Sequence, residues 1–242
     1  MEISILLTYQ EMEAQLLQGK TAVIIDTLRA TSTIVTALYH GAKRVETRVG
    51  IPETHQRGQE LGQSRYLLCG ERNGVMVEGF DKGNSPQEYQ SDKIKDKVII
   101  LSTTNGTKTI QHAKAADHFL IGSLLNKSVT MEEVIALEKE LMLCCSGTQG
   151  HFSLEDFVTA GAMINYLKEK GIKFQGDDRV QTAWLLYKRY ADELSYLMSQ
   201  SQNGSRLVKI GQQKDIEFCA REDIYPILCY GVGDYIQKRI SS

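Results

Sequence analysis

Short runs of apolar, largely β-branched residues recur along the chain, and a polar segment follows each of them. The three clearest runs cover residues 21–25, 97–101 and 141–144. Runs of this length are typical of strands that are buried on both faces of a parallel sheet. Beyond the polar segments, apolar residues return at helical spacing over residues 33–40, 106–113 and 154–170. The repeated order of strand, polar segment and helix predicts an α/β fold.

Weaker patterns extend the same fold. Further strands are predicted over residues 44–48, 66–69, 118–121 and 207–210, and a helix is predicted over residues 179–200. Residues 203–205 have the composition of a turn, and the glycine-rich residues 70–86 predict a long ordered loop rather than a hairpin. No low-complexity linker interrupts the chain. We therefore expect a parallel or mixed sheet between two layers of helices. We expect the whole chain, residues 1–242, to form a single domain, built either as one unit or as two interwoven lobes with a cleft between them.

Composition and charge narrow the classes of partner. The net charge is −2 with both signs interspersed, so the chain has no global basic field for nucleic acid. No apolar stretch of the sequence is long enough to span a bilayer. The five cysteines form no CxxC pair, and their apolar flanks are typical of buried thiols in a reducing compartment. These features predict a cytoplasmic protein without nucleic-acid or membrane partners.

The polar segments after the three strands are the candidate functional site, because ligands bind beyond the carboxyl ends of parallel strands. The segments contain Asp26, Arg29, Thr31 and Ser32, then Ser102, Thr103, Thr104, Asn105 and Gly106, and then Cys145, Ser146, Gly147, Glu155 and Asp156. Hydroxyl groups, glycine and backbone N–H groups at a helix start bind phosphate well, and Arg29 adds a planar cationic fork. Each residue alone is more often a helix cap, but two such segments beside an arginine favour an anionic ligand.

A fourth polar stretch supplies further charge. Residues 70–86 contain Glu71, Arg72, Asp81 and Asn84. With Asp26 and Asp156, these acids offer oxygen ligands for a hard cation, although Mg²⁺ typically takes only one or two carboxylates. For Asp26, a metal-binding or nucleophilic role and a helix-cap role are equally favoured. For Glu155 and Asp156, the spacing alone favours the cap, because acids stabilise a helix start.

Several common catalytic motifs are absent from the sequence. It contains no GxxxxGK[ST], no GxGxxG after a strand and no GxSxG, which argues against a P-loop, a dinucleotide fold and a nucleophile elbow. No arginine follows Cys144 or Cys145 at the six-residue spacing of a cysteine phosphatase. Leu28 stands where a haloacid-dehalogenase phosphatase has its second aspartate. The five histidines show no metal-ligand spacing, which argues against zinc.

Five segments together resemble the successive motifs of the 2-phosphosulfolactate phosphatase family. They are Asp26-Thr-Leu-Arg-Ala-Thr-Ser32, Gly70-Glu-Arg-Asn-Gly74, Gly79-Phe-Asp-Lys-Gly-Asn-Ser-Pro86, Ser102-Thr-Thr-Asn-Gly-Thr107 and Phe152-Ser-Leu-Glu-Asp156. The resemblance implies an α/β enzyme, expected to be a homodimer, with an active-site cleft. It also implies Mg²⁺-dependent hydrolysis of (R)-2-phospho-3-sulfolactate to 3-sulfolactate and phosphate. In methanogens this step leads to coenzyme M.

A substrate with phosphate, sulfonate and carboxylate groups needs several cationic or N–H donors. We expect catalytic roles for Asp26, Arg29, Asn105 and Asp156, and a magnesium site that draws on Asp26, Glu71 and Asp156. The expected substrate-binding residues are Arg29, Ser32, Arg72, Asn84, Ser102, Thr103, Thr104, Asn105 and Gly106. Attack on phosphorus comes either from water activated by the metal or from Asp26, with Cys145 as a third candidate.

Two other functions are compatible with these residues. The first is a phosphatase of the same fold that acts on another small 2-phospho-hydroxyacid, because motifs determine the class of reaction better than the substrate. The second is a protein that senses an anionic metabolite without turnover. The acids argue against this second function, because a pure anion binder gains nothing from carboxylates at its site.

Overall fold

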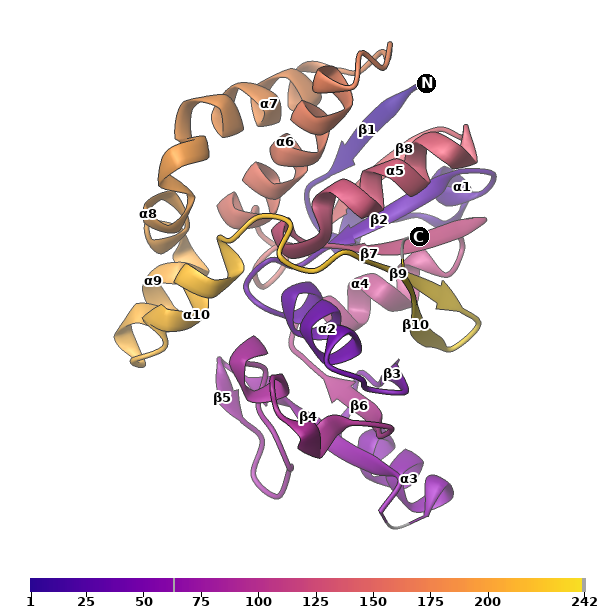
Figure 1. Ribbon diagram of the computed structural model, residues 1–242, viewed down its shortest axis with the longest axis vertical. Helices are drawn as coiled ribbons and strands as arrows, with labels where there is room; N and C mark the ends of the chain where they lie inside the picture. The colour runs from indigo at the N-terminus through magenta and orange to yellow at the C-terminus, as the bar shows by residue number, and fades with distance from the viewer. Residues whose placement is uncertain (63, 241–242) are drawn as a thin grey trace.

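One mixed sheet runs through the molecule. The computed structural model describes residues 1–62 and 64–240, and its ten strands have the order β1-β8-β2-β7-β9-β10-β3-β6-β4-β5 (Figure 1). The first half is parallel and contains β1 (Ile3–Leu6), β8 (Leu141–Cys145), β2 (Thr21–Ile25) and β7 (His118–Gly122). The second parallel set contains β3 (Arg44–Thr47), β6 (Val98–Ser102) and β4 (Tyr66–Arg72). Antiparallel β9 (Ile227–Val232) and β10 (Tyr235–Ile240) join the two halves, and β5 (Val75–Met76) pairs with β4 at the edge.

Helices cover both faces of the sheet. They are α1 (Ala14–Leu17), α2 (Ala30–Tyr39), α3 (Ile51–Leu61), α4 (Gly106–Ala113), α5 (Lys127–Leu137), α6 (Leu154–Glu169), α7 (Asp178–Tyr190), α8 (Leu194–Ser199), α9 (Gln202–Lys209) and α10 (Gln213–Cys219). Short 3-10 helices lie at Tyr9–Glu11, Pro86–Tyr89, Asp92–Ile94, Leu124–Asn126 and Ala191–Glu193. None of the helices in the described part of the chain is long and apolar enough to cross a bilayer.

Alternating side chains of β2 fill two separate cores. In β2, Ala22 and Ile24 pack in the core that contains residues of α2 and α4, whereas Val23 and Ile25 pack in the core that contains residues of α6. This alternation follows from the two-residue repeat of a strand, and burial on both faces explains the continuous apolar run over 21–25. The predicted α/β fold, with a mixed sheet flanked by helices, is confirmed.

The predicted strand over residues 207–210 and the predicted turn over 203–205 are wrong. These residues form α9 and the end that follows it. Ser201 caps this helix, because its Oγ accepts a hydrogen bond from the backbone N–H of Gly204 at 2.9 Å. A Cβ atom on Gly204 would lie 1.9 Å from the carbonyl oxygen of Met198, so glycine is required here for close approach. Long-range packing therefore overrides the turn-like composition.

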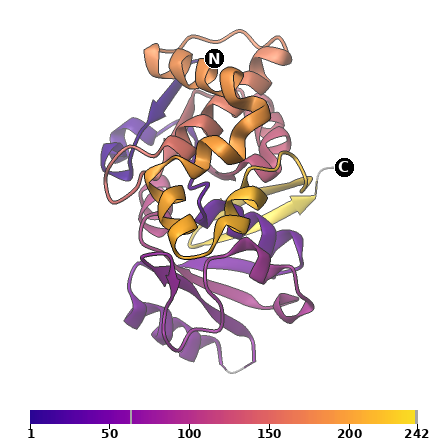
Figure 2. The same cartoon turned by 90° about the vertical axis from the view of Figure 1, so that its left-hand side faces the viewer.

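The helix predicted over residues 179–200 is interrupted. It forms α7 and α8, and a 3-10 turn at Ala191–Glu193 separates them. In Figure 2, the segment from α8 to α10 faces the viewer in the middle of the molecule and lies across the two halves of the sheet. The apolar residues that follow it form β9, a strand that the sequence patterns did not indicate.

The structure also corrects the prediction of a long loop over residues 70–86. β4 and β5 form a short hairpin in which Glu71 pairs with Met76 and Arg72 pairs with Val75. Asn73 and Gly74 form its turn, with φ angles of 56° and 83°. An Asn-Gly pair with two positive φ angles is the preferred sequence of a two-residue hairpin turn. The rest of the stretch is irregular as far as Pro86.

Candidate functional site

A small polar cavity lies where the predicted segments after β2 and β6 meet the β4–β5 hairpin and α9. Six of the predicted residues line it: Asp26, Arg29, Glu71, Asn84, Thr103 and Asn105. Asn203, Arg206 and Leu207 of α9 close its other side. The cavity holds about 20 Å³, which is room for about one water molecule. Residues predicted from the sequence therefore form most of one side of this cavity, and residues of α9 that were not predicted form the other side.

Asp26 stands directly after β2 and combines a structural contact with an open oxygen. Its Oδ1 accepts a hydrogen bond from the backbone N–H of Ala30 at 3.1 Å, at the start of α2. In the described part of the chain, its Oδ2 has no hydrogen-bond partner, and the residue lines the cavity. Asp26 therefore acts as a helix cap through one oxygen and presents the other to a ligand.

Asp156 connects the loops that follow β2 and β8. Its Oδ1 accepts a hydrogen bond from the backbone N–H of Thr27 at 2.8 Å, and its Oδ2 accepts one from Gly147 at 3.2 Å. Ser153 caps α6 by accepting the N–H of Asp156 itself. Asp156 lies close enough to Asp26 for their charges to interact, although it is not among the residues that line the cavity.

Burial and mutual repulsion act on these carboxyl groups. Burial raises the pKa of Asp26 from 3.8 to about 7, and the negative charges of Glu71 and Glu155 contribute to the rise. Burial also raises the pKa of Asp156 well above its usual value, with contributions from Asp26 and Glu155. The pKa of Glu155 is raised mainly by burial. A bound cation would offset this concentration of negative charge.

Glu71 connects the hairpin to the segment after β6. Its Oε1 accepts hydrogen bonds from both the N–H and the Oγ1 of Thr104, at 2.8 and 2.9 Å. Its Oε2 accepts the N–H of Gly74 at 2.6 Å. Both oxygens therefore position backbone around the cavity, and each retains lone pairs for a further ligand.

The two arginines that were predicted to bind substrate are engaged by the protein. Arg29 donates through Nη1 to Asp215 Oδ2 at 2.6 Å and to Gln212, and through Nη2 to the carbonyl oxygen of Gly74 at 2.9 Å. Arg72 donates to Ser102 Oγ at 2.9 Å and to the carbonyl oxygens of Val49, Glu71 and Ser102. In this conformation, Arg29 joins the hairpin to α10, and Arg72 anchors the end of β6.

The remaining predicted residues differ in whether their polar side-chain atoms have hydrogen-bond partners in the protein. Ser32 Oγ donates to the carbonyl oxygen of Thr27 inside α2, and this residue is not among those that line the cavity. Thr103 Oγ1 accepts from Thr107, and Asn105 Oδ1 accepts from Gln149 at 3.3 Å, so both have protein partners. Asn84 is the exception, because its buried Oδ1 has no partner within the described residues.

Three residues of the site were not among those predicted: Asp215 holds Arg29, and Asn203 and Arg206 line the cavity. They lie on α9 and α10, outside the five segments that carry the family resemblance. Glu155 belonged to the third predicted segment, where its spacing favoured a helix cap, and it contributes a buried acid.

The acids fit a magnesium ion that is held partly by water and substrate. Within residues 1–62 and 64–240, no group of three or more His, Cys, Asp or Glu side chains is close enough to hold a metal ion directly. Mg²⁺ normally takes only one or two carboxylates, with waters and phosphate oxygens in its other positions. The open Oδ2 of Asp26 and the raised pKa of its carboxyl group match such a ligand.

Gly106 lies against the carboxylate of Asp26. A Cβ atom at this position would lie 2.7 Å from Asp26 Oδ2 and 2.6 Å from the Cβ of Ala30. We expect Gly106→Ala to lower kcat by about 10- to 100-fold, because the methyl group would displace the reactive carboxylate. Steady-state kinetics and a melting curve of the purified variant would test this. Unchanged kcat would show that the position of Asp26 Oδ2 does not matter for turnover.

Cys145, the third candidate nucleophile, is 1% exposed at the end of β8. Burial raises the pKa of its thiol well above the usual value, and the nearby Asp156 adds to this effect. The reactive form of cysteine is the thiolate, so both observations argue against a catalytic role.

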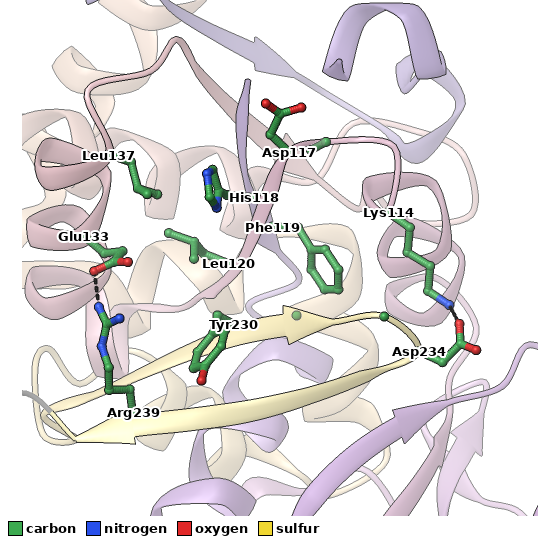
Figure 3. Close-up of a pocket in the computed structure, with 13 residues that line it drawn as sticks. Lys114, Asp117, His118, Phe119, Leu120, Glu133, Leu137, Tyr230, Asp234 and Arg239 are labelled. Carbon is green, nitrogen blue, oxygen red and sulfur yellow. Dashed lines mark hydrogen bonds and ion pairs between the residues drawn. The ribbon is translucent and has the colours of Figure 1, made fainter. Parts of the chain in front are cut away.

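A larger cavity, of about 350 Å³, lies between β7, α5 and the β9–β10 hairpin (Figure 3). Its charged groups are paired with one another: Lys114 with Asp234, and Arg239 with Glu133. Asp117 is paired with Lys139. Because these cations are already neutralised and the cavity has no cluster of buried acids, it does not match a phosphate and metal site.

Comparison with known proteins gives one consistent result. Residues 6–233 match the family model described as 2-phosphosulpholactate phosphatase. A relative from Symbiobacterium thermophilum is 40% identical over 215 residues, which cover 89% of this chain and 92% of the relative. Another from Caldanaerobacter subterraneus subsp. tengcongensis is 38% identical, with 91% of each chain covered. A third from Synechocystis is 39% identical, with 86% of this chain and 87% of the relative covered. All three are described as probable 2-phosphosulfolactate phosphatases.

Proposed function

Because the chain belongs to the 2-phosphosulfolactate phosphatase family, we propose that it hydrolyses (R)-2-phospho-3-sulfolactate to 3-sulfolactate and phosphate. The observation that carries this proposal is the open Oδ2 of Asp26 in a cavity bordered by the starts of α2 and α4. Backbone N–H groups at helix starts favour phosphate oxygens, and the neighbouring acids suit a cation that accompanies phosphate.

Magnesium is the proposed cofactor. If a water attacks phosphorus, Asp26 would hold the ion through Oδ2, with Glu71 or Asp156 as the second carboxylate. If Asp26 Oδ2 itself attacks, Glu71 and Asp156 would hold the ion. When bound, Mg²⁺ neutralises charge on the phosphoryl oxygens as the ester bond breaks.

The protein groups around the cavity position the reactants. Asp26 Oδ1 is held by Ala30, and Thr104 and Gly74 hold Glu71, so the two acids have fixed orientations. Attack on phosphorus comes either from Asp26 Oδ2, which would form an aspartyl-phosphate that water then cleaves, or from a water beside it. Acid quench during turnover of ³²P-labelled substrate separates these two routes: label on the protein indicates Asp26, and unlabelled protein indicates water.

Substrate entry requires the cavity to open. A volume of about 20 Å³ cannot contain a molecule with phosphate, sulfonate and carboxylate groups. The hairpin turn lies against α9 and the residue that follows it, because a Cβ atom on Gly74 would lie 3.8 Å from Leu207 Cδ2 and 3.0 Å from Ile210 Cδ1. Arg29 connects the same turn to α10. We propose that the hairpin and α9 separate to admit substrate and close again for the reaction.

Phosphate release from 2-phosphosulfolactate tests the proposed reaction. We expect release with Mg²⁺ and at least about 100-fold less with EDTA, because the phosphoryl charge is then unneutralised. A panel of 2-phospho-hydroxyacids that lack the sulfonate is the comparison. Preference for one of these would replace the proposed substrate but leave the reaction class intact. Binding without release in any metal would identify a binding protein instead. The cytoplasmic location and the homodimer remain predictions from sequence.

A further inference from the structure

We propose that Arg206 binds the non-reacting anionic end of the substrate, its carboxylate or its sulfonate, and so selects phosphate esters that carry a further anionic group. This inference rests on the proposed phosphatase function and adds a residue that determines specificity. Neither the sequence motifs nor the predicted anion-binding residues included this arginine.

Arg206 lines the cavity, and its guanidinium has an unused donor. Its Nη2 donates to Asn203 Oδ1, whereas its buried Nε has no hydrogen-bond partner in the part of the chain that the structure describes. Within the same residues, no carboxylate lies within 4.0 Å of this guanidinium. Leaving a charged donor buried without a partner is unfavourable, so the arrangement points to a ligand that completes it.

The second arginine of the cavity cannot easily take this role. Arg29 is 3% exposed, and Asp215, Gln212 and Gly74 already accept its hydrogen bonds. Among the described residues, the side chain of Arg29 makes three hydrogen bonds and that of Arg206 makes one, so Arg206 has more donors to spare. A guanidinium fork matches the geometry of both carboxylate and sulfonate oxygens.

The fold fixes Arg206 relative to Asp26. Asn203, one turn earlier on α9, donates through Nδ2 to the carbonyl oxygen of Leu28, two residues after Asp26. The same Asn203 accepts the hydrogen bond from Arg206. One side chain thus couples the proposed anion-binding arginine to the loop that carries the reactive carboxylate. Asn84 brings a second unpaired polar group, its buried Oδ1, to the same cavity from the loop after β5.

Arg206→Gln tests the inference through KM and binding together. We expect KM for 2-phosphosulfolactate to rise by about 10- to 100-fold, the usual effect of losing a hydrogen bond to a charged group, with a smaller change in kcat. Calorimetric affinity for 3-sulfolactate should fall by a similar factor, whereas inhibition by inorganic phosphate should stay within about twofold of wild type. Arg206→Lys should restore part of the loss. The exposed Lys209→Gln, on the same helix, is the matched control.

Two further substrates identify the anionic group that Arg206 binds. 2-Phospholactate keeps the carboxylate and lacks the sulfonate. The phosphate ester of 2-hydroxyethanesulfonate keeps the sulfonate and lacks the carboxylate. The substrate that is least affected by Arg206→Gln lacks the group that the arginine binds. An unchanged KM, or equal loss of affinity for 3-sulfolactate and inorganic phosphate in a folded variant, would overturn the inference. If wild type does not hydrolyse 2-phosphosulfolactate, the substrate assignment fails. The change in KM between wild type and Arg206→Gln is then measured with the phosphoester that wild type does hydrolyse, and this change decides the role of Arg206.

Discussion

Asp26→Asn is expected to lower kcat by about 1,000-fold or more and, in metal-free protein, to raise the free energy of unfolding. The loss of activity follows from the loss of the charged oxygen that faces the cavity, whether it attacks phosphorus or holds the cation. The gain in stability follows because the asparagine retains an oxygen for the Ala30 N–H and removes a buried charge.

The stability effect has a defined pH dependence. The pKa of Asp26 is raised from 3.8 to about 7 by burial and neighbouring acids, so ionisation is less favourable in the folded protein than in the unfolded chain. The free-energy cost of ionising Asp26 in the folded protein is absent below pH 3.8. It grows as the pH rises from 3.8 towards 7 and is complete above about pH 7. We therefore expect Asp26→Asn to stabilise the metal-free protein by about 1–3 kcal/mol at pH 8 and by less at pH 5.

Urea unfolding at the two pH values, with EDTA and with Mg²⁺, measures this effect. Mg²⁺ should stabilise wild type at pH 8 and have little effect on the variant, because a ligand stabilises the state that binds it. The exposed Asp192→Asn is the control and should change neither activity nor stability by much. Normal turnover by Asp26→Asn, or destabilisation at pH 8 without metal, would contradict the proposed role of this carboxylate.

Asp215→Ala is expected to lower the free energy of unfolding by about 3–5 kcal/mol, because it leaves the buried Arg29 without its charged partner. The two side chains are 3% and 4% exposed, and their nitrogen and oxygen atoms are 2.6 Å apart. Asp215 also accepts hydrogen bonds from Ser85 and Gln87, so the same change removes the contact between α10 and the loop after β5.

The pair between Lys114 and Asp234 is the matched comparison, because Asp234 is 80% exposed. Asp234→Ala should cost at most about 1 kcal/mol, since solvent screens an exposed pair. Chemical denaturation of both variants measures the difference. Similar losses in the two would mean that Arg29 finds another partner or water when Asp215 is removed. Such a result would also mean that the connection between the hairpin and α10 does not depend on the pair between Arg29 and Asp215.

The parts of the site that local patterns determine could be predicted from the sequence. Asp26 follows β2, and Thr103 and Asn105 follow β6, so local patterns place each of them just beyond the carboxyl end of a buried strand. β2 and β6 belong to parallel sets that run in opposite directions, so the convergence of these residues depends on how the two halves of the sheet meet. The acids were recognised, but the sequence could not show that Asp156 would accept hydrogen bonds from the loops after β2 and β8. That arrangement depends on how the ends of separate strands meet.

The parts that depend on contacts between distant segments were missed. Arg206 lies next to an Asn-Gly-Ser segment that resembles a turn, but in the structure the Ser201 cap, the approach of Gly204 to Met198 and the packing of Leu207 accompany a helix. Arg29 was correctly placed near the site, but its engagement by Asp215 depends on residues nearly two hundred positions away. Local propensity does not contain this information, because tertiary contacts override it.

The position of β9 and β10 has a consequence for how the protein is made. These last strands lie in the middle of the sheet, between the half that carries Asp26 and the half that carries Glu71. Residues 227–240 follow all the other strands along the chain, so they leave the ribosome after them, and until then the two halves lack the strands that join them. The sheet, and the cavity that needs both halves, is completed only once these residues have emerged, and a nascent chain that stops short of them has no finished cavity.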